Sequence, residues 1–447
     1  MTRRFRHPAH LLLAAAFLLA GCGQPGGRTS GDESAQPGRN SDVATAPEKA
    51  TTTIVLAHPY IGAAAEAIAG AAAMFDESRP DVTVQLRPTA VEDILFSIPH
   101  DIRAGKGPDV FIAPDTFARH WATLDNILQP LDVLLKTTDA VPGSQPASGQ
   151  AGAGAATGSR LSPDGRPYGL ALAVRVPMLV ANDDFLGAEF KFTPGDDSRP
   201  TAVSVVANDW LALTGFATAG GGQIIDGTGR AAFDDPAAAT GMVALAGLLE
   251  SGAIRPERSR QAIIDAFNDS GIAAMITWPD SISLISSSIS WRIVPFPEIE
   301  GVGRPQPWWQ IDSIFVSSWS RHRRQAADLA TWLASPTAAD YLMRHDFPGL
   351  AGRDGGMINP AQGDQAALQY AALPVNRGIL TQRAAAIPSP DLPATATAAT
   401  FFARLATDLA ASPANAAKGA GAAVEKAARD ARDAVTKVMQ SSSFRLK

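Results

Sequence analysis

Short apolar runs alternate with longer Ala-rich segments along the chain after residue 51. A continuous apolar run of this kind is typical of a strand buried on both faces, and a longer segment that stops at Pro is typical of a helix. Strands are expected at 52–57, 82–86 and 109–113, and helices at 63–76 and 91–104. Strand, helix, strand, helix, strand indicates an α/β fold with a parallel sheet.

The same pattern continues through the rest of the chain. Residues 168–181 are apolar apart from Arg175 and Pro177, and so long an extended run can leave one lobe and enter another. Further helices are expected at 210–216, 236–249, 325–334 (ended by Pro336) and 422–439, strands at 271–277, 292–295 and 313–318, and a hairpin at 223–229. The Gly-, Ala- and Ser-rich residues 142–160 are expected to form an exposed loop.

The N-terminus has the pattern of an export signal. Three arginines precede an apolar run at 11–20, which is too short to span a bilayer. The run ends in Leu-Ala-Gly-Cys, which resembles the bacterial lipoprotein cleavage box and implies a signal peptide at 1–21 and a lipid on Cys22. The alternative is a plain signal peptide with an incidental cysteine. Residues 22–52 contain few large apolar side chains, so we expect a disordered tether.

Charge and cysteine content exclude some classes of binding partner and of metal site. The net charge is −6, and removal of 1–21 takes away three arginines, so the remaining chain carries 35 basic and 44 acidic residues and a charge of −9. This acidic balance argues against a nucleic-acid partner and suits a protein that must not adhere to an anionic membrane. The single cysteine excludes an intrachain disulfide and a Cys-based zinc site.

Several short motifs, in order, resemble the maltose-type extracellular solute-binding proteins, family 1. Each motif is weak alone, but together they run in order from about residue 53 to about residue 350. They are Gly-Lys-Gly-Pro-Asp-Val-Phe at 105–111, Leu-Gln-Pro-Leu-Asp at 128–132, Gly-Arg-Pro-Tyr-Gly-Leu at 165–170, Phe-Asp-Asp-Pro at 233–236 and Ala-Phe-Asn at 266–268. Trp308-Trp309 stands where the family usually has small glycines, so the ligand class stays open.

The resemblance implies a two-lobed periplasmic-binding-protein fold of type II, with lobes joined by crossing strands. By position, the first lobe takes 53–172 and 297–347, and the second takes 173–296 and 348–447. A small ligand would bind between the lobes and shift them toward a closed form, which a permease then recognises. The implied protein is the lipid-anchored binding component of an ABC importer in the cell envelope, expected as a monomer.

Candidate ligand-binding residues lie where expected strands end. A sugar site needs flat aromatic surfaces together with carboxylates and amides. Trp278 and Asp280 follow one strand, where the family places an aromatic residue in the cleft. At most one of Trp308 and Trp309 faces the ligand, because adjacent residues of an extended segment point to opposite faces. Asp312 follows three residues later.

Three more candidates come from the first sheet, because ligands of such sheets lie beyond the carboxyl ends of the strands. His58 and Tyr60 follow the first strand, and Asp115 follows the third. Asp109, at the start of a strand, is expected to be structural. Five other tryptophans are expected in the core, at 121, 210, 291, 319 and 332.

Other chemistry finds little support in the sequence. The five histidines after residue 21 are scattered, no nucleophile elbow or P-loop occurs, and no cofactor or metal site is predicted. We therefore expect a binding protein and not an enzyme, with a small solute, an oligosaccharide or other sugar, as its ligand. Two alternatives stay open: a sensor that presents its ligand to a membrane receptor or kinase, and a glycan hydrolase, although no carboxylate pair can be placed from sequence.

Overall fold

The computed structural model describes residues 51–134, 166–185, 190–192, 202–350, 369–370, 372–389, 395–412 and 417–443. All of them belong to one compact unit, Lys49–Lys447. Cys22, the signal peptide and the loop 142–160 lie outside the described residues, as does nearly all of the tether.

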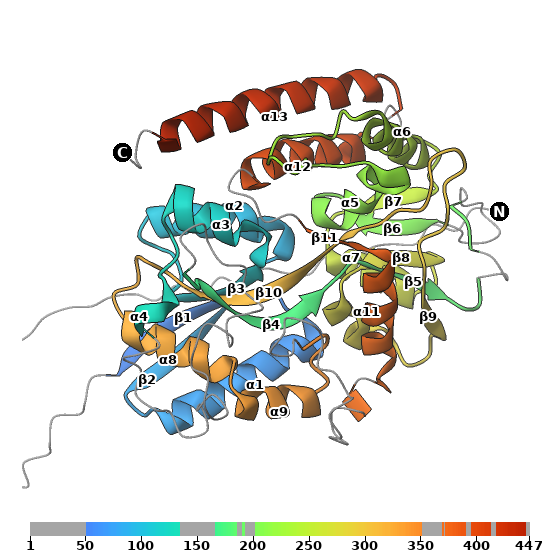
Figure 1. Ribbon diagram of the computed structural model, residues 1–447. Helices are drawn as coiled ribbons and strands as arrows, with labels where there is room; N and C mark the ends of the chain where they lie inside the picture. Colours follow the sequence, from blue (N-terminus) through green and yellow to red (C-terminus); the bar gives the residue numbers. More distant parts are fainter. Residues whose placement is uncertain are drawn as a thin grey trace, which may run out of the picture. The chain divides into compact units, whose positions relative to one another are not determined.

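Two β-sheets form the framework (Figure 1). The first has the order β11-β10-β3-β1-β2, with β4 also paired to β10. Its strands are β1 (Thr52–His58), β2 (Val82–Pro88), β3 (Val110–Pro114), β4 (Gly169–Arg175), β10 (Trp308–Val316) and β11 (Ile387–Pro388). β1 runs parallel to β2 and β3, and β10 runs antiparallel to β3 and β4. Ile54 and Leu56 of β1 are fully buried, because helices cover this sheet.

The second sheet has the order β7-β6-β8-β5-β9. Its strands are β5 (Met178–Asn182), β6 (Val203–Val206), β7 (Ile254–Glu257), β8 (Ala274–Thr277) and β9 (Trp291–Val294). The chain passes from the first sheet to the second at Val176-Pro177, between β4 and β5, and returns between β9 and β10. The apolar run around Arg175 therefore does contain a change of sheet.

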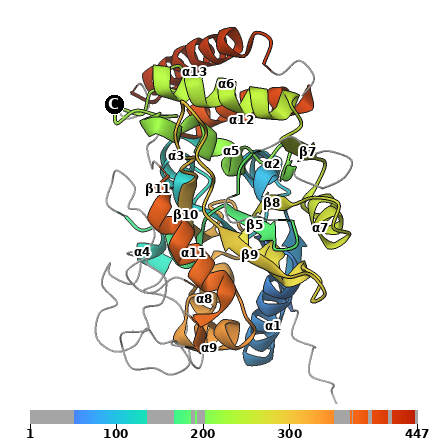
Figure 2. The same ribbon diagram turned by 90° about the vertical axis from the view of Figure 1, so that its right-hand side faces the viewer.

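Helices α1 (Gly62–Ser78), α8 (Arg323–Leu333) and α9 (Pro336–Arg344) pack together beside the first sheet, and α2 (Val91–Arg103) lies in the same part of the chain. Helices α5 (Trp210–Ala217), α6 (Pro236–Glu250) and α7 (Arg260–Asn268) belong to the second. Near the C-terminus, α11 (Pro374–Ala385) contacts β9 and β5, whereas α12 (Thr395–Ala411) and α13 (Ala420–Ser443) stack on α5 and α6 (Figures 1 and 2). Short segments complete the framework: η1 (Asp115–Phe117), α3 (Ala118–His120), η2 (Trp121–Asp125), α4 (Leu131–Leu134), η3 (Ala219–Gly221) and η4 (Pro279–Leu284).

The predicted α/β fold and most of its first elements are confirmed, with three corrections. β10 begins at Trp308 and not at residue 313, so both neighbouring tryptophans are strand residues. Pro336 opens α9 as its first residue, a position where its missing N–H is not needed, after α8 has already ended at Leu333. Trp319 was expected in the core, but it lies in the turn after β10 and is 58% exposed. Within the described residues, no helix combines the length and apolar character needed to cross a bilayer.

Candidate functional site

The turn after β1 brings the first sheet against η4, which follows β8 of the second sheet. The backbone N–H of Ile61 donates to Asp280 Oδ2 at 3.1 Å, and that of Ala63 donates to Ser283 Oγ at 3.1 Å. Gly62 has a φ of +57°, and a Cβ there would lie 2.5 Å from Ser283 Oγ. A residue without a side chain is therefore needed where the two segments meet.

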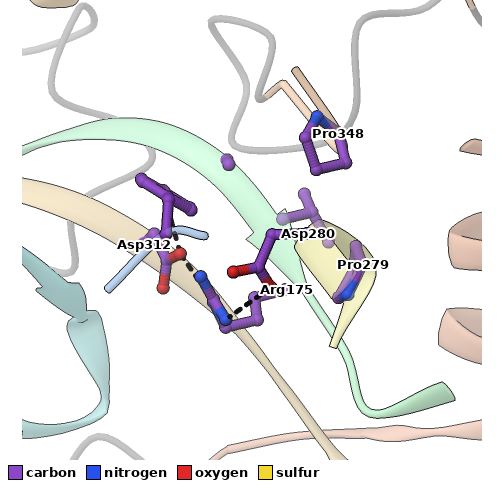
Figure 3. Close-up of a pocket in the computed structure, with 8 residues that line it drawn as sticks. Arg175, Pro279, Asp280, Asp312 and Pro348 are labelled. Carbon is purple, nitrogen blue, oxygen red and sulfur yellow. Dashed lines mark hydrogen bonds and ion pairs between the residues drawn. The ribbon is translucent and has the colours of Figure 1, made fainter. Parts of the chain in front are cut away.

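A buried arginine forms the centre of the site. Arg175 ends β4, and its side chain is 3% exposed. Its Nε donates to Asp312 Oδ2 at 2.7 Å, and its Nη1 lies 3.5 Å from Asp280 Oδ1 (Figure 3). Asp312 belongs to β10 of the first sheet and Asp280 to η4. One guanidinium thus joins carboxylates from two parts of the fold, as a buried charge requires.

A second arginine completes the charge balance on Asp280. Arg260, the first residue of α7, donates from Nη1 to Asp280 Oδ2 at 2.9 Å. Its Nη2 donates to the carbonyl oxygen of Pro59, also at 2.9 Å. The Arg260 side chain therefore binds to both sides of the junction, and the cluster contains two cations and two carboxylates.

Two aromatic rings face the Arg175 guanidinium. Its carbon lies 5.2 Å from the centre of the Tyr60 ring and 5.1 Å from that of Trp278, within cation–π range. Tyr60 also donates its hydroxyl hydrogen to Asp312 Oδ2 at 2.9 Å. A hydrogen bond holds the Trp278 ring in place, because its Nε1 donates to Asp209 Oδ2 at 2.6 Å. The rings of His58 and Tyr60 are stacked with centres 6.2 Å apart.

Burial and charge change how these groups titrate. Burial lowers the pKa of His58 to about 4, against a smaller opposing effect of Asp280. Burial, followed by the charge of Asp312, raises the pKa of Tyr60 well above its ordinary value. Burial raises the pKa of Asp312, and Arg175 opposes that shift. For Arg175, burial acts to lower the pKa, but the two carboxylates outweigh it and the pKa lies above the usual range.

A small pocket lies among these side chains. Its cavity volume is about 10 Å³, room for about one water molecule. It is lined by Tyr60, Ala173, Val174, Arg175, Pro279, Asp280, Asp312 and Pro348. Asp280 Oδ1, Asp312 Oδ1 and His58 Nδ1 are buried, and none of them has a hydrogen-bond partner among the described residues. The two carboxylates line the pocket, and His58 stacks on Tyr60, which also lines it. Buried polar atoms without hydrogen-bond partners are uncommon in folded proteins, so we take this pocket as the candidate functional site.

Five of the eight candidates from the sequence therefore come together: His58, Tyr60, Trp278, Asp280 and Asp312. The other three lie elsewhere. Trp308 is 3% exposed and packs edge-on against Trp210, with ring centres 6.4 Å apart. Trp309 is half-buried, and Arg383 lies 4.2 Å from its ring centre. Asp115 is buried in η1 and accepts from the backbone N–H of Ile311. Neither tryptophan nor Asp115 is among the residues that line the pocket, and ligand contact at these positions stays a prediction.

The two arginines were not predicted as site residues. The sequence does contain a reason to single out Arg175. It is the lone arginine in an apolar run that is typical of a buried strand, and a buried arginine needs a carboxylate partner. Arg260 has no comparable signal. Asp109, expected to be structural, accepts from the Val55 N–H and from Ser320 Oγ. Within the described residues no cluster of His, Cys, Asp or Glu is arranged to hold a metal ion.

Comparison with known families identifies the chain. The family model for bacterial extracellular solute-binding proteins matches residues 58–340, more than half of the sequence. The chain belongs to this family. The matched range includes every residue of the Arg175 cluster, and the resemblance drawn from sequence is confirmed. A search of curated protein sequences gave no match.

Solved structures confirm the two-lobed fold of type II. A maltotriose-binding protein of Thermus thermophilus, bound to maltotriose, has a TM-score of 0.64 at 15% identity and covers 86% of this chain and 100% of its own. A maltose/maltodextrin-binding domain of Bdellovibrio bacteriovorus, also with maltotriose, gives 0.62 at 18%, with 85% and 100% covered. A receptor of Streptomyces glaucescens, with structures in the unliganded form and in complex with acarbose, has a TM-score of 0.63 at 15% identity, with 85% of this chain and 99% of its own covered.

Proposed function

We propose that this solute-binding protein captures an oligosaccharide or other sugar at the Arg175 pocket and delivers it to an ABC permease. The observation that carries the proposal is that two buried carboxylate oxygens, Asp280 Oδ1 and Asp312 Oδ1, accept no hydrogen bond from the described residues. Sugar hydroxyl groups are donors that such oxygens accept, and charge-assisted bonds of this kind are strong. The similar proteins of Thermus and Bdellovibrio are bound to maltotriose, which supports the same class of ligand.

The aromatic rings supply the second requirement of a sugar site. Tyr60 and Trp278 present faces to the Arg175 guanidinium, and a sugar ring presents an apolar C–H face to the same kind of surface. We infer that a ligand takes over part of the space and of the hydrogen bonds that Arg175 now uses. The guanidinium then serves as a donor to ligand oxygens.

Ligand entry requires that the site open. A cavity of about 10 Å³ cannot admit a sugar ring, since ligand pockets usually measure about 300–1,000 Å³. The described conformation is therefore closed on its own side chains. We infer that opening separates Ile61 and Pro59 from Asp280 and Arg260, and that ligand stabilises a closed form by contacts to both sides.

The proposed lobes comprise 53–172 with 297–347, and 173–296 with 348–447. The distribution of strands supports this division, because β1–β3 and β10 lie in one sheet and β5–β9 in the other. The contacts of α12 and α13 with α5 and α6 support placing the C-terminal segment with the second lobe. β4 and β11 are exceptions, since residues 173–175 of β4 and both residues of β11 fall in the second lobe by these bounds but pair with β10 of the first sheet.

We further propose that Cys22 carries a lipid and anchors the protein in the cell envelope. A Cys22→Ser variant is expected to lose metabolic labelling by a fatty-acid probe and to leave the membrane fraction. The unchanged protein is the control. Labelling that persists in the variant would contradict the anchor.

Calorimetry with a panel of sugars that includes maltotriose and acarbose tests the ligand class. The unchanged chain is expected to release heat with at least one sugar and to change its small-angle scattering profile on binding. Asp312→Asn, which keeps the shape but removes the charge, is expected to weaken binding by roughly tenfold or more. Arg432→Met, on the surface away from the pocket, is the matched control and should bind normally. A panel without heat and without a scattering change would contradict the proposal.

We propose binding without catalysis, by a monomer. Both pocket carboxylates are ion-paired with arginine, so neither is poised as an uncompensated base. Incubation with the bound sugar should leave it intact by mass spectrometry, and light scattering should give the mass of one chain. Cleavage of the sugar would instead support a hydrolase.

A further inference from the structure

The turn between β10 and α8 exposes a tryptophan in a basic setting. Trp319 is 58% exposed, and Arg321, Arg323 and Arg324 that follow it are also exposed. Within the described part of the chain neither Arg321 nor Arg323 forms an ion pair, and Arg323 donates to the backbone oxygen of Ser318. We call residues 319–324, which include the first two residues of α8, the Trp319 turn. A single exposed apolar side chain is common at a protein surface, but here it stands beside three exposed arginines in a protein of net negative charge.

The Trp319 turn is held in place, so this exposure is not a consequence of loose packing. Ser320 Oγ donates to Asp109 Oδ1 at 2.6 Å, and the Trp319 N–H donates to Ser317 Oγ at 3.2 Å. Just before the turn, Ser318 Oγ donates to the backbone oxygen of Asn126 at 2.8 Å. Both flanks of the indole are therefore tied to the first sheet and to the segment after η2, and the ring still faces solvent.

The turn also lies at the end of the first sheet where the chain enters it. Asp109, which binds Ser320, accepts from the Val55 N–H through its other carboxylate oxygen, at 3.0 Å. β10 ends at Val316, beside Val110 at the start of β3, and β3 runs parallel to β1, so the turn lies at the end of the sheet where β1 begins. Residues 22–51, which carry the proposed lipid at Cys22, attach at this same end. The pocket lies at the opposite end of β1, beyond His58.

We propose that the Trp319 turn contacts the anionic lipid headgroups of the membrane that holds the anchor. Indole rings favour the bilayer interface, and arginine side chains bind phosphate oxygens. The rest of the molecule carries net negative charge, which such a surface repels. Charges act over about 8 Å at physiological ionic strength, so the local basic turn decides the sign of the interaction. The contact therefore orients the anchored protein on the bilayer while it is not docked on the permease.

A vesicle assay tests this orientation contact without the lipid anchor. It uses residues 22–447 with Cys22→Ser, sedimented with vesicles of phosphatidylcholine alone or with phosphatidylglycerol added. Binding is expected only with phosphatidylglycerol, and it should fall as salt rises. Arg321→Gln with Arg323→Gln should weaken partitioning roughly 25-fold, about fivefold for each arginine, whereas the double Lys variant retains it. Trp319→Ser should weaken it roughly tenfold.

The matched controls lie on other helices. Arg377→Gln with Arg404→Gln changes the net charge by the same amount at exposed positions of α11 and α12, and Leu380→Ser removes another exposed apolar side chain. These variants should bind like the parent, and all variants should keep its melting temperature. Equal losses in both arginine pairs, or binding that ignores phosphatidylglycerol, would overturn the proposal. So would variants at the turn that bind vesicles normally but impair uptake, which would assign the turn to a protein partner. Sugar binding is measured separately and is unaffected by any of these outcomes.

Discussion

The buried Arg175–Asp312 pair and the surface Arg432–Asp234 pair differ more in their surroundings than in their geometry. Arg432, on α13, binds Asp234 through two bonds of 2.6 and 2.7 Å, whereas Arg175 makes one bond of 2.7 Å to Asp312. The Arg432 and Asp234 side chains are 28% and 22% exposed, and those of Arg175 and Asp312 are 3% and 0%. Water can therefore replace either partner at the surface, but not in the centre of the protein.

The comparison shows why the buried pair, although it has only one hydrogen bond, affects the free energy of unfolding more than the surface pair does. A buried charge that loses its partner keeps its desolvation cost, whereas an exposed charge is rehydrated. The same property suits the buried pair to ligand binding, because a ligand that supplies new partners gains from charges that water does not reach. The surface pair joins α13 to the turn before α6, where water reaches both side chains.

The largest effect is expected at Arg175. Arg175→Met should lower the free energy of unfolding by about 3–5 kcal/mol, because Asp312 then stays buried without a cation. Urea unfolding at neutral pH measures this loss. Adding Asp312→Asn to the same chain should recover part of it, since the orphaned charge is removed. A single variant as stable as the parent would show that the buried pair does not differ from a surface pair.

A pH effect is expected at His58. The folded protein protonates this ring only near pH 4, whereas the unfolded chain protonates it near pH 6.5. The unfolded state therefore binds more protons between these values, and the free energy of unfolding falls as pH drops from 6.5 to 4, by up to about 3 kcal/mol. In His58→Gln this contribution should disappear. Urea unfolding at several pH values compares the two proteins, and parallel pH profiles would contradict the assignment.

A smaller loss is expected at Tyr60. Tyr60→Phe keeps the ring that faces Arg175 but removes the donor to Asp312 Oδ2. A hydrogen bond to a charged group contributes about 1.5–3 kcal/mol, and the free energy of unfolding should fall by about that amount. Thermal and urea unfolding both report it. If Tyr60→Leu lowered the free energy of unfolding no more than Tyr60→Phe does, the ring itself would contribute nothing to stability.

The smallest effect is expected at Arg432. Arg432→Met should cost less than about 1 kcal/mol at neutral pH, because the pair is exposed to water. Arg432 lowers the pKa of Asp234, so the stabilisation is present above the carboxyl group's ordinary value of 3.8 and is lost as pH falls through the lowered range. Salt should reduce it further. A loss as large as that of Arg175→Met would remove the distinction drawn between the two pairs.

The sequence located much of the site, but only as separate positions. His58, Tyr60, Trp278, Asp280 and Asp312 were singled out because each follows or lies near an expected strand end. Which of them meet depends on how β4, η4 and β10 approach one another, and β4 lies more than 100 residues before the other two in the sequence. Trp308 illustrates the limit: its residue type suited a sugar site, yet β10 begins at this residue and places it against Trp210.

The local sequence pattern by itself determined the α/β class and the order of the first strands and helices. A strand buried on both faces needs a continuous apolar run, and helix ends favour particular residues, so both can be recognised from neighbouring positions. It also determined the family, through motifs that follow one another in order. Only the tertiary structure decided that Arg175 stands between two carboxylates and that Trp319 faces solvent. Helices α11 and α12 were likewise not predicted from the pattern. The physical reason is that pairing and burial are set by contacts between distant segments, which local pattern does not contain.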